Sequence, residues 1–129
     1  MNIIPESHKD LLGAPVGVLA TNGADGFPQV SAVWFLHDED GLLRMTLATT
    51  RQKVKNMQRN PDVSFLIIDP ANPYRTLEIR ARSEISPDPD YEFANKLGKK
   101  YEADIHSFDP PGTTRVVATL HPVKANAYG

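Results

Sequence analysis

The residues of this chain that are best suited to chemistry gather in one short basic segment. Thr49 and Thr50 precede the run RQKVKNMQR, which has four cations and no acid. Two hydroxyls, the cations Arg51 and Lys53, and the free N–H groups of a predicted helix start are all groups that bind phosphate. Asn56 lies three residues past Lys53 and therefore on the same helix face. The segment also fits a solvent-exposed basic helix, and taken alone it leaves both interpretations open.

A predicted strand over residues 29–36 can complete such a phosphate site. Alternation along this strand places three residues on one face: Gln29, Ser31 and Val33. If the first three strands pair consecutively, this face lies beside the corner at Thr49. A flat heteroaromatic ring can then lie along the strand edge with its phosphate at the helix. We expect the side chains of Trp34 and Phe35 to be core and interface residues.

Several other chemistries find no support in the sequence. The chain has no cysteine, which excludes cysteine nucleophiles, disulfides, thiolate zinc sites and iron–sulfur clusters. Its four histidines have no metal-ligand spacing, so we expect no metal site. Asp104, His106 and Ser107 are hydrolase residue types, but they lie in a predicted loop without the turn that presents a nucleophilic serine. Glycine-rich dinucleotide and triphosphate motifs are also absent from the sequence.

Length and charge limit the class of protein. From 129 residues, 40% of them hydrophobic, we expect one globular domain spanning residues 1–129. The net charge of −2 argues against a general nucleic-acid binder. No apolar run approaches the ~18 residues of a membrane span. The lack of cysteine and of a signal peptide predicts a cytoplasmic protein.

The elements that must position the basic segment are mostly strands. Eleven prolines and eight glycines divide the chain into short pieces that alternate apolar and polar residues. We predict about six strands, over residues 16–21, 29–36, 42–48, 63–68, 76–85 and 115–125. The first three are expected to form an antiparallel meander, and residues 63–68 a fully buried central strand. So small a mainly β chain is best arranged as a closed or partly closed barrel, which also removes exposed strand edges.

Two or three short helices and a loop complete the predicted elements, and two of the helices have clear start signals. A threonine N-cap at residues 49–50 is expected to start a helix of about three turns that ends before Pro61. Asp88 and Pro89 have the types of an N-cap and a first helical residue, and they start the second helix. The apolar face of this helix is made of residues four apart: Phe93, Leu97 and Tyr101. Residues 104–112 are predicted to be a loop.

Two stretches of the chain resemble one known family. They read GFPQVSAVWF over residues 26–35 and TTRQKVKNMQRNPDVS over residues 49–64. Both are similar to the pyridoxamine phosphate oxidase-like split-barrel superfamily, and more narrowly to its branch that uses the deazaflavin coenzyme F-420. The resemblance covers almost the whole chain. It implies a six-stranded antiparallel split barrel of the FMN-binding type, which forms a homodimer with the cofactor in a groove between protomers.

The resemblance also implies which residues contact the cofactor. The phosphate-binding positions are Thr49, Thr50, Arg51, Lys53 and Asn56. The strand that lines the ring consists of Gln29, Val30, Ser31, Ala32 and Val33. The loop that the partner chain offers to the cofactor is Pro73, Tyr74 and Arg75.

The function that this resemblance implies is a coenzyme F-420-dependent reductase, which transfers hydride to an unsaturated or conjugated small planar organic substrate. Because the cofactor holds that chemistry, no side chain need be a nucleophile or base, and we predict no catalytic residue. The proton that completes the reduction can come from a tyrosine such as Tyr74 or Tyr101, or from water. Two alternatives stay open. One is an FMN-binding oxidoreductase of the same fold, and the other is a non-catalytic binder of the cofactor or of a planar tetrapyrrole.

Overall fold

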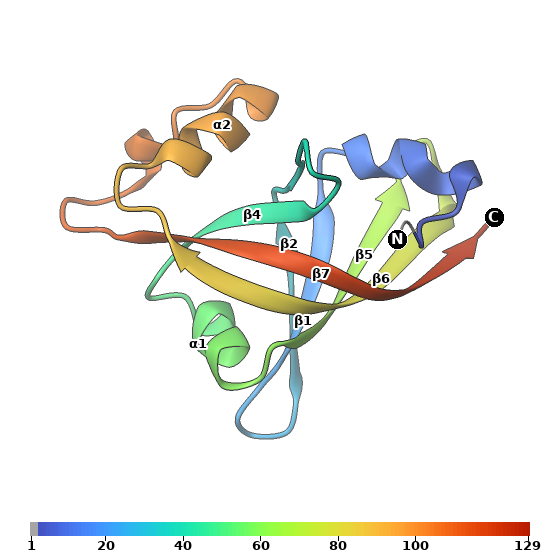
Figure 1. Cartoon of the computed structure of the whole chain (residues 1–129), viewed down its shortest axis with the longest axis horizontal. Helices are drawn as coiled ribbons and strands as arrows, with labels where there is room; N and C mark the ends of the chain where they lie inside the picture. The colour runs from blue at the N-terminus through green and yellow to red at the C-terminus, as the bar shows by residue number, and fades with distance from the viewer. Residues whose placement is uncertain (1–2) are drawn as a thin grey trace.

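The chain folds around one curled antiparallel sheet. The structure is a computed structural model, and it describes residues 3–129. Seven strands follow the order β2-β1-β5-β6-β7-β4-β3 across the sheet. Their bounds are β1 Gly17–Asn22, β2 Pro28–Val33, β3 Leu36–His37, β4 Leu43–Ala48, β5 Asp62–Asp69, β6 Asn72–Pro87 and β7 Arg115–Tyr128. Figure 1 shows the long β6 and β7 running side by side through the middle of the molecule.

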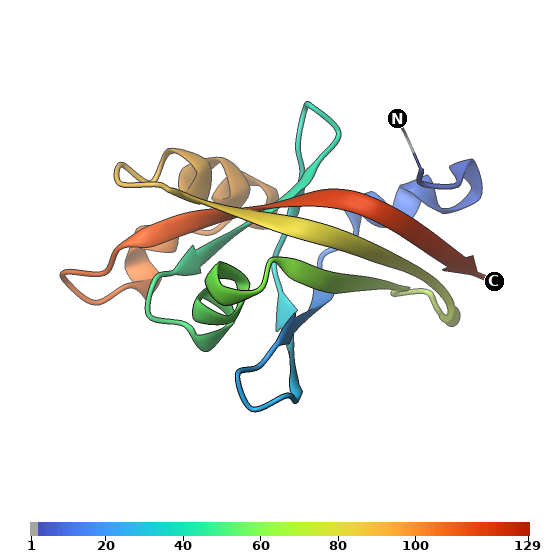
Figure 2. The same ribbon diagram turned by 60° about the horizontal axis from the view of Figure 1, so that its bottom comes forward.

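Four short helices lie at the two ends of this sheet. They are the 3-10 helices η1 Glu6–Gly13 and η2 Ile105–Phe108 and the α-helices α1 Gln52–Arg59 and α2 Glu92–Tyr101. Both views, Figures 1 and 2, place α1 and α2 at the end opposite the chain termini, whereas η1 lies at the end with the termini. The basic segment is therefore far from the ends of the chain.

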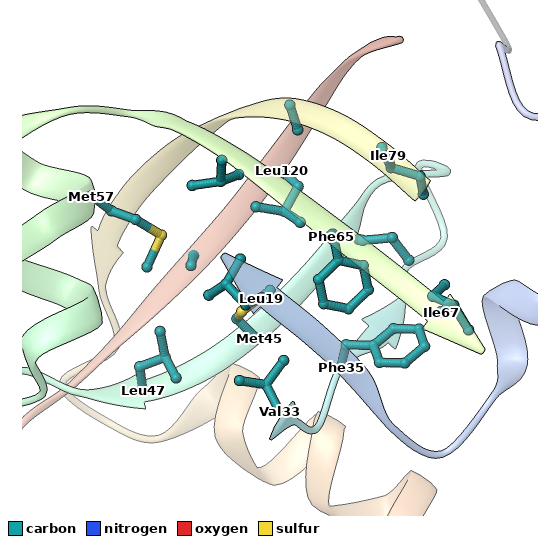
Figure 3. Packing of buried hydrophobic residues seen from close by; sticks show 14 of the residues in the cluster. Leu19, Val33, Phe35, Met45, Leu47, Met57, Phe65, Ile67, Ile79 and Leu120 are labelled. Carbon is teal, nitrogen blue, oxygen red and sulfur yellow. The ribbon is translucent and has the colours of Figure 1, made fainter. Parts of the chain in front are cut away.

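One face of every strand except the two-residue β3 supplies the core. Every second residue is buried in β4 and along most of β1, as alternation in the sequence predicts. Figure 3 shows Phe35 and Phe65 together at the centre, where their rings meet edge to face with centroids 5.1 Å apart. Each fully buried side chain of this size stabilises the fold by about 1.5–3 kcal/mol. The largest members of the core are Leu19, Phe35, Met45, Phe65, Ile67, Leu77 and Leu120.

The two edges of the sheet are joined by only two residues, Trp34 and Phe35. β2 and β3 flank this pair in the chain but occupy opposite ends of the strand order, so the sheet curls into a barrel. The backbone of Phe35 is bonded by side chains of α2: its N–H donates to the Tyr101 hydroxyl at 2.9 Å, and its carbonyl accepts from the Lys100 ammonium group at 2.7 Å. Because these groups are satisfied, the strand can break here without leaving buried polar atoms unpaired.

The predicted fold class is confirmed as a mainly β antiparallel split barrel. The strand count is seven because the predicted strand 29–36 is divided at Trp34. The predicted meander is confirmed for its first pair, since β1 and β2 are antiparallel neighbours, and is wrong for its second, since β4 pairs with β7 and β3 and not with β2. β5 is central, between β1 and β6, but only one of its faces is in the core. Ile68 on the other face is 41% exposed.

The helices differ from the predictions at their starts. α1 has eight residues rather than about three turns, and it ends before Pro61 as expected. α2 begins at Glu92, later than predicted, because Tyr91 adopts a left-handed conformation with φ 57°. The Asp88 carboxylate still accepts from two N–H groups of the first turn, at 3.0 and 3.2 Å. Asp88 therefore caps α2 from four residues before its start. The predicted loop 104–112 contains η2.

Candidate functional site

The start of α1 lies at the corner where β4 ends. The N–H of Thr49 donates to the Thr114 carbonyl at 3.0 Å, and the two hydroxyls are 2.7 Å apart. Thr49 therefore joins the end of β4 to the residue before β7. The N-cap of α1 is Arg51, whose side chain makes no capping hydrogen bond, so the predicted threonine N-cap is wrong. An uncapped helix start presents N–H donors and a positive dipole end, which favour an anion.

Two cations stand at this uncapped start. Lys53 is only 4% exposed, yet its ammonium group has no hydrogen bond or ion pair with any of residues 3–129. Burial, and then the charge of Arg51, hold the pKa of Lys53 below its ordinary value. Arg51 is exposed and likewise has no acidic partner among the described residues. No described side-chain nitrogen or oxygen is both fully buried and without a hydrogen bond, so the Lys53 ammonium group keeps contact with the groove that it lines. A largely desolvated cation without a counter-ion favours an anion, which would pair it.

A groove of about 580 Å³ begins at this corner and continues towards α2 and η2. The corner end is lined by Thr50, Arg51 and Lys53, and Ala32 and Val33 at the end of β2 line the groove next to Trp34. The far end is lined by apolar side chains: Trp34, Leu97, Ile105, Phe108 and Pro110. The groove thus joins a cationic end to an apolar end, as a ligand with a phosphate and a flat ring requires.

Asn56 supports this corner from behind. It is buried on α1, and its amide donates to the Thr21 hydroxyl at 3.0 Å and to the Gln29 side chain at 3.2 Å. Its carbonyl oxygen accepts from Gln52 at 2.9 Å. The Asn56 side chain is therefore used within the protein, where it seats α1 against β1 and β2. Asn56 and Gln29 therefore position α1 against the sheet.

The structure brings together five of the predicted site residues in one groove: Ala32, Val33, Thr50, Arg51 and Lys53. The predicted closeness of strand 29–33 to the helix start is therefore found, although barrel closure produces it rather than a meander. Val30 does not line the groove. It lies on the outer face of the sheet and is 61% exposed. Ser31 is half-buried on the inner face, opposite Leu19.

The predicted partner loop lies at the other end of the molecule. Pro73, Tyr74 and Arg75 lie at the start of β6, directly after the β5–β6 turn, which Figures 1 and 2 place beside the chain termini and away from α1. Pro73 and Tyr74 are exposed. The guanidinium of Arg75 is held by Asp10 at 2.6 Å and Asp69 at 3.0 Å. Within one chain these three residues do not reach the groove.

The sequence analysis missed an ion pair that lines the groove between the α1 corner and η2. Arg115 donates to both carboxylate oxygens of Asp109, at 2.7 and 2.8 Å, and both side chains are largely buried. The Tyr91 hydroxyl donates to the same carboxylate at 2.7 Å. The Arg115 guanidinium lowers the pKa of Asp109 below its usual range, so the pair is charged but internally neutral. No local motif marks these residues, because the β4–β7 pairing brings them to the corner.

Phe35 is a core residue as predicted, whereas Trp34 is 39% exposed and lines the groove.

The hydrolase-like residues have local structural roles. Asp104 accepts the N–H of His106 at 3.1 Å and caps η2, and the Ser107 hydroxyl donates to the Asp104 carbonyl at 2.6 Å. The His106 ring stacks on Tyr91 with centroids 3.8 Å apart.

Over residues 3–129, His, Asp and Glu form no group of three or more that could hold a metal ion. Within that part of the chain, no helix is long and apolar enough to cross a membrane.

Comparisons with known proteins agree with this fold. A family profile described as pyridoxamine 5'-phosphate oxidase matches residues 4–128. A solved structure named F420 reductase is 42% identical, with a TM-score of 0.83, and the alignment covers 95% of this chain and 98% of that one.

Two more distant solved structures share the fold. A conserved hypothetical protein from Mycobacterium tuberculosis is 23% identical, with a TM-score of 0.75 and coverage of 98% of this chain and 85% of that one. HupZ of Group A Streptococcus is 18% identical, with a TM-score of 0.72 and coverage of 96% and 93%. The family profile and the F420 reductase, each matching nearly the whole chain, establish that this protein belongs to the pyridoxamine 5'-phosphate oxidase-like split-barrel family, in the branch represented by the F420 reductase.

Proposed function

We propose that the protein is a coenzyme F-420-dependent reductase of small unsaturated or conjugated organic substrates. The observation that carries the proposal is the buried and unpaired Lys53 beside Arg51 at the uncapped start of α1. A phosphate group fits this set of donors. The 42% identity to a protein named F420 reductase supports the deazaflavin over FMN.

The chain's own residues provide binding and orientation. Arg51, Lys53 and the first N–H groups of α1 would hold the phosphate, and Ala32 and Val33 would border the ring. When bound, the reduced deazaflavin supplies the hydride. A flat ligand lying against the apolar far end would displace water from that region. No side chain in the groove needs to act as a nucleophile.

Neither tyrosine considered as a proton source is placed for that role within one chain. The Tyr101 hydroxyl contacts the carbonyls of Pro15 and Phe35, at 2.8 and 2.9 Å, and accepts from the Phe35 N–H. Tyr74 lies at the start of β6, away from the groove, and is 87% exposed. Water is therefore the proton source that we favour.

A homodimer is the second part of the proposal. The outer face of the sheet carries a continuous apolar surface over β2, β1 and β5: Val18, Ala20, Val30, Ala32, Leu66 and Ile68. An exposed apolar surface of this kind is typical of a protein interface. A second copy on this face would supply the loop Pro73–Arg75 that one chain cannot bring to its own groove. A cytoplasmic location remains part of the same proposal.

Equilibrium titration of the purified protein with F-420 and with FMN tests the proposal. We expect F-420 to bind more tightly, and its reduced form to be oxidised by enones or quinones. Tight FMN binding without F-420 binding would favour the FMN oxidoreductase instead. Binding of F-420 without oxidation across a panel of enones, quinones and tetrapyrroles would favour the non-catalytic binder.

A further inference from the structure

The charged residues that line the groove are of two kinds, those paired with each other and those without a partner. Four charged residues line it: Arg51, Lys53, Asp109 and Arg115. Asp109 and Arg115 neutralise each other through two hydrogen bonds, whereas the two cations of the α1 corner have no acidic partner in the described chain. An anionic group of a ligand is therefore attracted to the α1 end, and the rest of the groove lining offers no unpaired charge.

An aromatic surface occupies this uncharged end. The Trp34 indole stacks on the Tyr101 ring with centroids 4.2 Å apart and planes within 3°. Phe108 meets Trp34 edge to face, at 6.1 Å and 66°. Because Tyr101 covers one face of the indole, the 39% of Trp34 that stays exposed belongs to its other face and its edges. Phe108 is itself 56% exposed beside the indole.

The position of Trp34 is fixed by hydrogen bonds of its neighbour. The Phe35 backbone binds the Tyr101 hydroxyl and the Lys100 ammonium group, which also donates to the Ala14 carbonyl at 2.8 Å. The Trp34 ring and the Phe35 backbone are thus both held by side chains at the C-terminal end of α2, Lys100 and Tyr101. A flat surface that is already rigid binds a planar ligand without the entropic cost of ordering it.

The position of Phe108 is fixed from the other side. Phe108 is the last residue of η2, and the next residue is Asp109, whose carboxylate is held by Arg115 and Tyr91. These bonds anchor the loop that carries Phe108. Asp109 and Arg115 are therefore positioning residues for the aromatic surface.

We propose that Trp34 and Phe108 form the substrate-binding wall of the groove, and that Phe108 selects uncharged substrates with an extended flat ring over small acyclic ones. The inference rests on the proposed function, because it assigns the α1 end to the cofactor and the aromatic end to the substrate. An offset or edge-to-face contact with an aromatic ring, together with the area that it buries, changes affinity by about tenfold.

The test compares two acceptors in the native protein and in Phe108→Ala. With reduced F-420 as donor, we expect the variant to lose about tenfold in kcat/KM for 1,4-naphthoquinone and less than about twofold for methyl vinyl ketone. Phe27→Ala removes an even more exposed phenyl ring, 75% against 56% for Phe108, from the β1–β2 turn outside the groove, and should change neither value. Equal losses for both acceptors, or none, would overturn the assignment of Phe108.

A second measurement works without turnover. Trp34 is the sole tryptophan of the chain, so its fluorescence reports on this wall alone. We expect 1,4-naphthoquinone to quench it saturably in the cofactor-free protein, with about tenfold weaker binding in Phe108→Ala. Quenching that does not saturate would overturn the proposal. Saturable quenching without oxidation of reduced F-420 would instead support Trp34 and Phe108 as a binding wall and contradict the proposed reductase function. Far-UV circular dichroism of each variant checks that it is folded.

Discussion

Asn56 on α1 donates a hydrogen bond to the Thr21 hydroxyl on β1 at 3.0 Å, and both side chains are almost completely buried. The second amide hydrogen of Asn56 goes to Gln29 on β2 at 3.2 Å. α1 is thereby fixed against two strands at once, one of which borders the groove. The cation positions at the helix start depend on this contact, because Lys53 is one turn away from Asn56 on the same helix.

Replacing Thr21 by valine tests how strongly this contact holds α1. The variant keeps the shape of the side chain but removes the acceptor, and it leaves a buried amide hydrogen unpaired. We expect the free energy of unfolding to fall by about 1–3 kcal/mol. Denaturant titration measures it. Thr76→Val is the control, since that hydroxyl lies on the outer face without a partner in the described chain, and its effect should stay within about 0.5 kcal/mol. An equal effect of both variants would contradict the role of Thr21.

The two cations at the α1 start should dominate cofactor affinity. Lys53→Ala removes the charge of a largely buried side chain that a phosphate would pair, and Arg51→Ala removes an exposed one. Charge-assisted hydrogen bonds contribute about 1.5–3 kcal/mol, so we expect a 10- to 100-fold loss of F-420 affinity for Lys53→Ala, as an order of magnitude, and a smaller loss for Arg51→Ala. Lys55→Ala, an exposed cation on the same helix, is the matched control and should change affinity less than about twofold. Isothermal titration calorimetry separates these outcomes, and unchanged affinity in Lys53→Ala would make α1 an ordinary basic helix.

Cofactor binding should weaken as the pH rises, and earlier than for an ordinary lysine. Burial and the Arg51 charge lower the pKa of Lys53 in the free protein, whereas a bound phosphate favours the protonated amine and raises that pKa. Above the free-protein pKa, binding must take up a proton, so affinity falls as the pH increases through it. Lys53→Arg stays protonated and should remove this part of the pH dependence. Identical pH profiles of F-420 affinity for the native protein and Lys53→Arg would contradict this account.

The sequence predicts which segments form strands better than it predicts which strands pair with one another. Alternation identifies which residues of β4 face the core, since a strand has period two, and Leu43, Met45 and Leu47 are buried as expected. It does not say which strand lies next to β4. The break at Phe35 depends on hydrogen bonds from Lys100 and Tyr101, far along the chain, which no local pattern reveals.

The same limit applies to the site. Arg51 and Lys53 could be found because their types and spacing at a helix start indicate phosphate binding without knowledge of the tertiary structure. The opposite wall could not, since Phe108 and Arg115 reach the groove only through the pairing of β7 with β4. Local sequence thus indicates the cationic end of the groove, whereas the aromatic end is a product of the topology.

Gly17 should be intolerant of any side chain. A Cβ at this position would lie 2.1 Å from the Cζ of Phe65, a ring in the centre of the core. Gly17→Ala forces Phe65 to move within a packed interior, so we expect a loss of about 1–3 kcal/mol in unfolding free energy. Gly13→Ala is the control because a Cβ there meets nothing within 4 Å, and it should be neutral or slightly stabilising. Thermal and denaturant unfolding of the two variants distinguish them. Equal stability of both would contradict the packing of Phe65 over Gly17.

Val30→Asp should separate the proposed homodimer into monomers. Val30 is the most exposed aliphatic side chain on the outer face of the sheet, and it pairs with Ala20 in the middle of the apolar surface. A carboxylate buried there without a partner would be too costly for association, while the monomer fold should persist because the position is exposed within one chain. Light scattering after size exclusion should give twice the chain mass for the native protein and one chain mass for the variant. Lys99→Glu, a charge change on the exposed side of α2, should remain dimeric.

The same variant tests whether the groove needs a second copy. If Pro73, Tyr74 and Arg75 of a partner complete the site, Val30→Asp should lose F-420 affinity even though Arg51 and Lys53 are intact. Circular dichroism would show that the fold is retained. A native protein that is monomeric at concentrations where it binds F-420 would contradict the dimer. A monomeric Val30→Asp with native affinity would instead show that one chain holds the cofactor by itself, and the contacts at the α1 corner would then account for the whole binding energy.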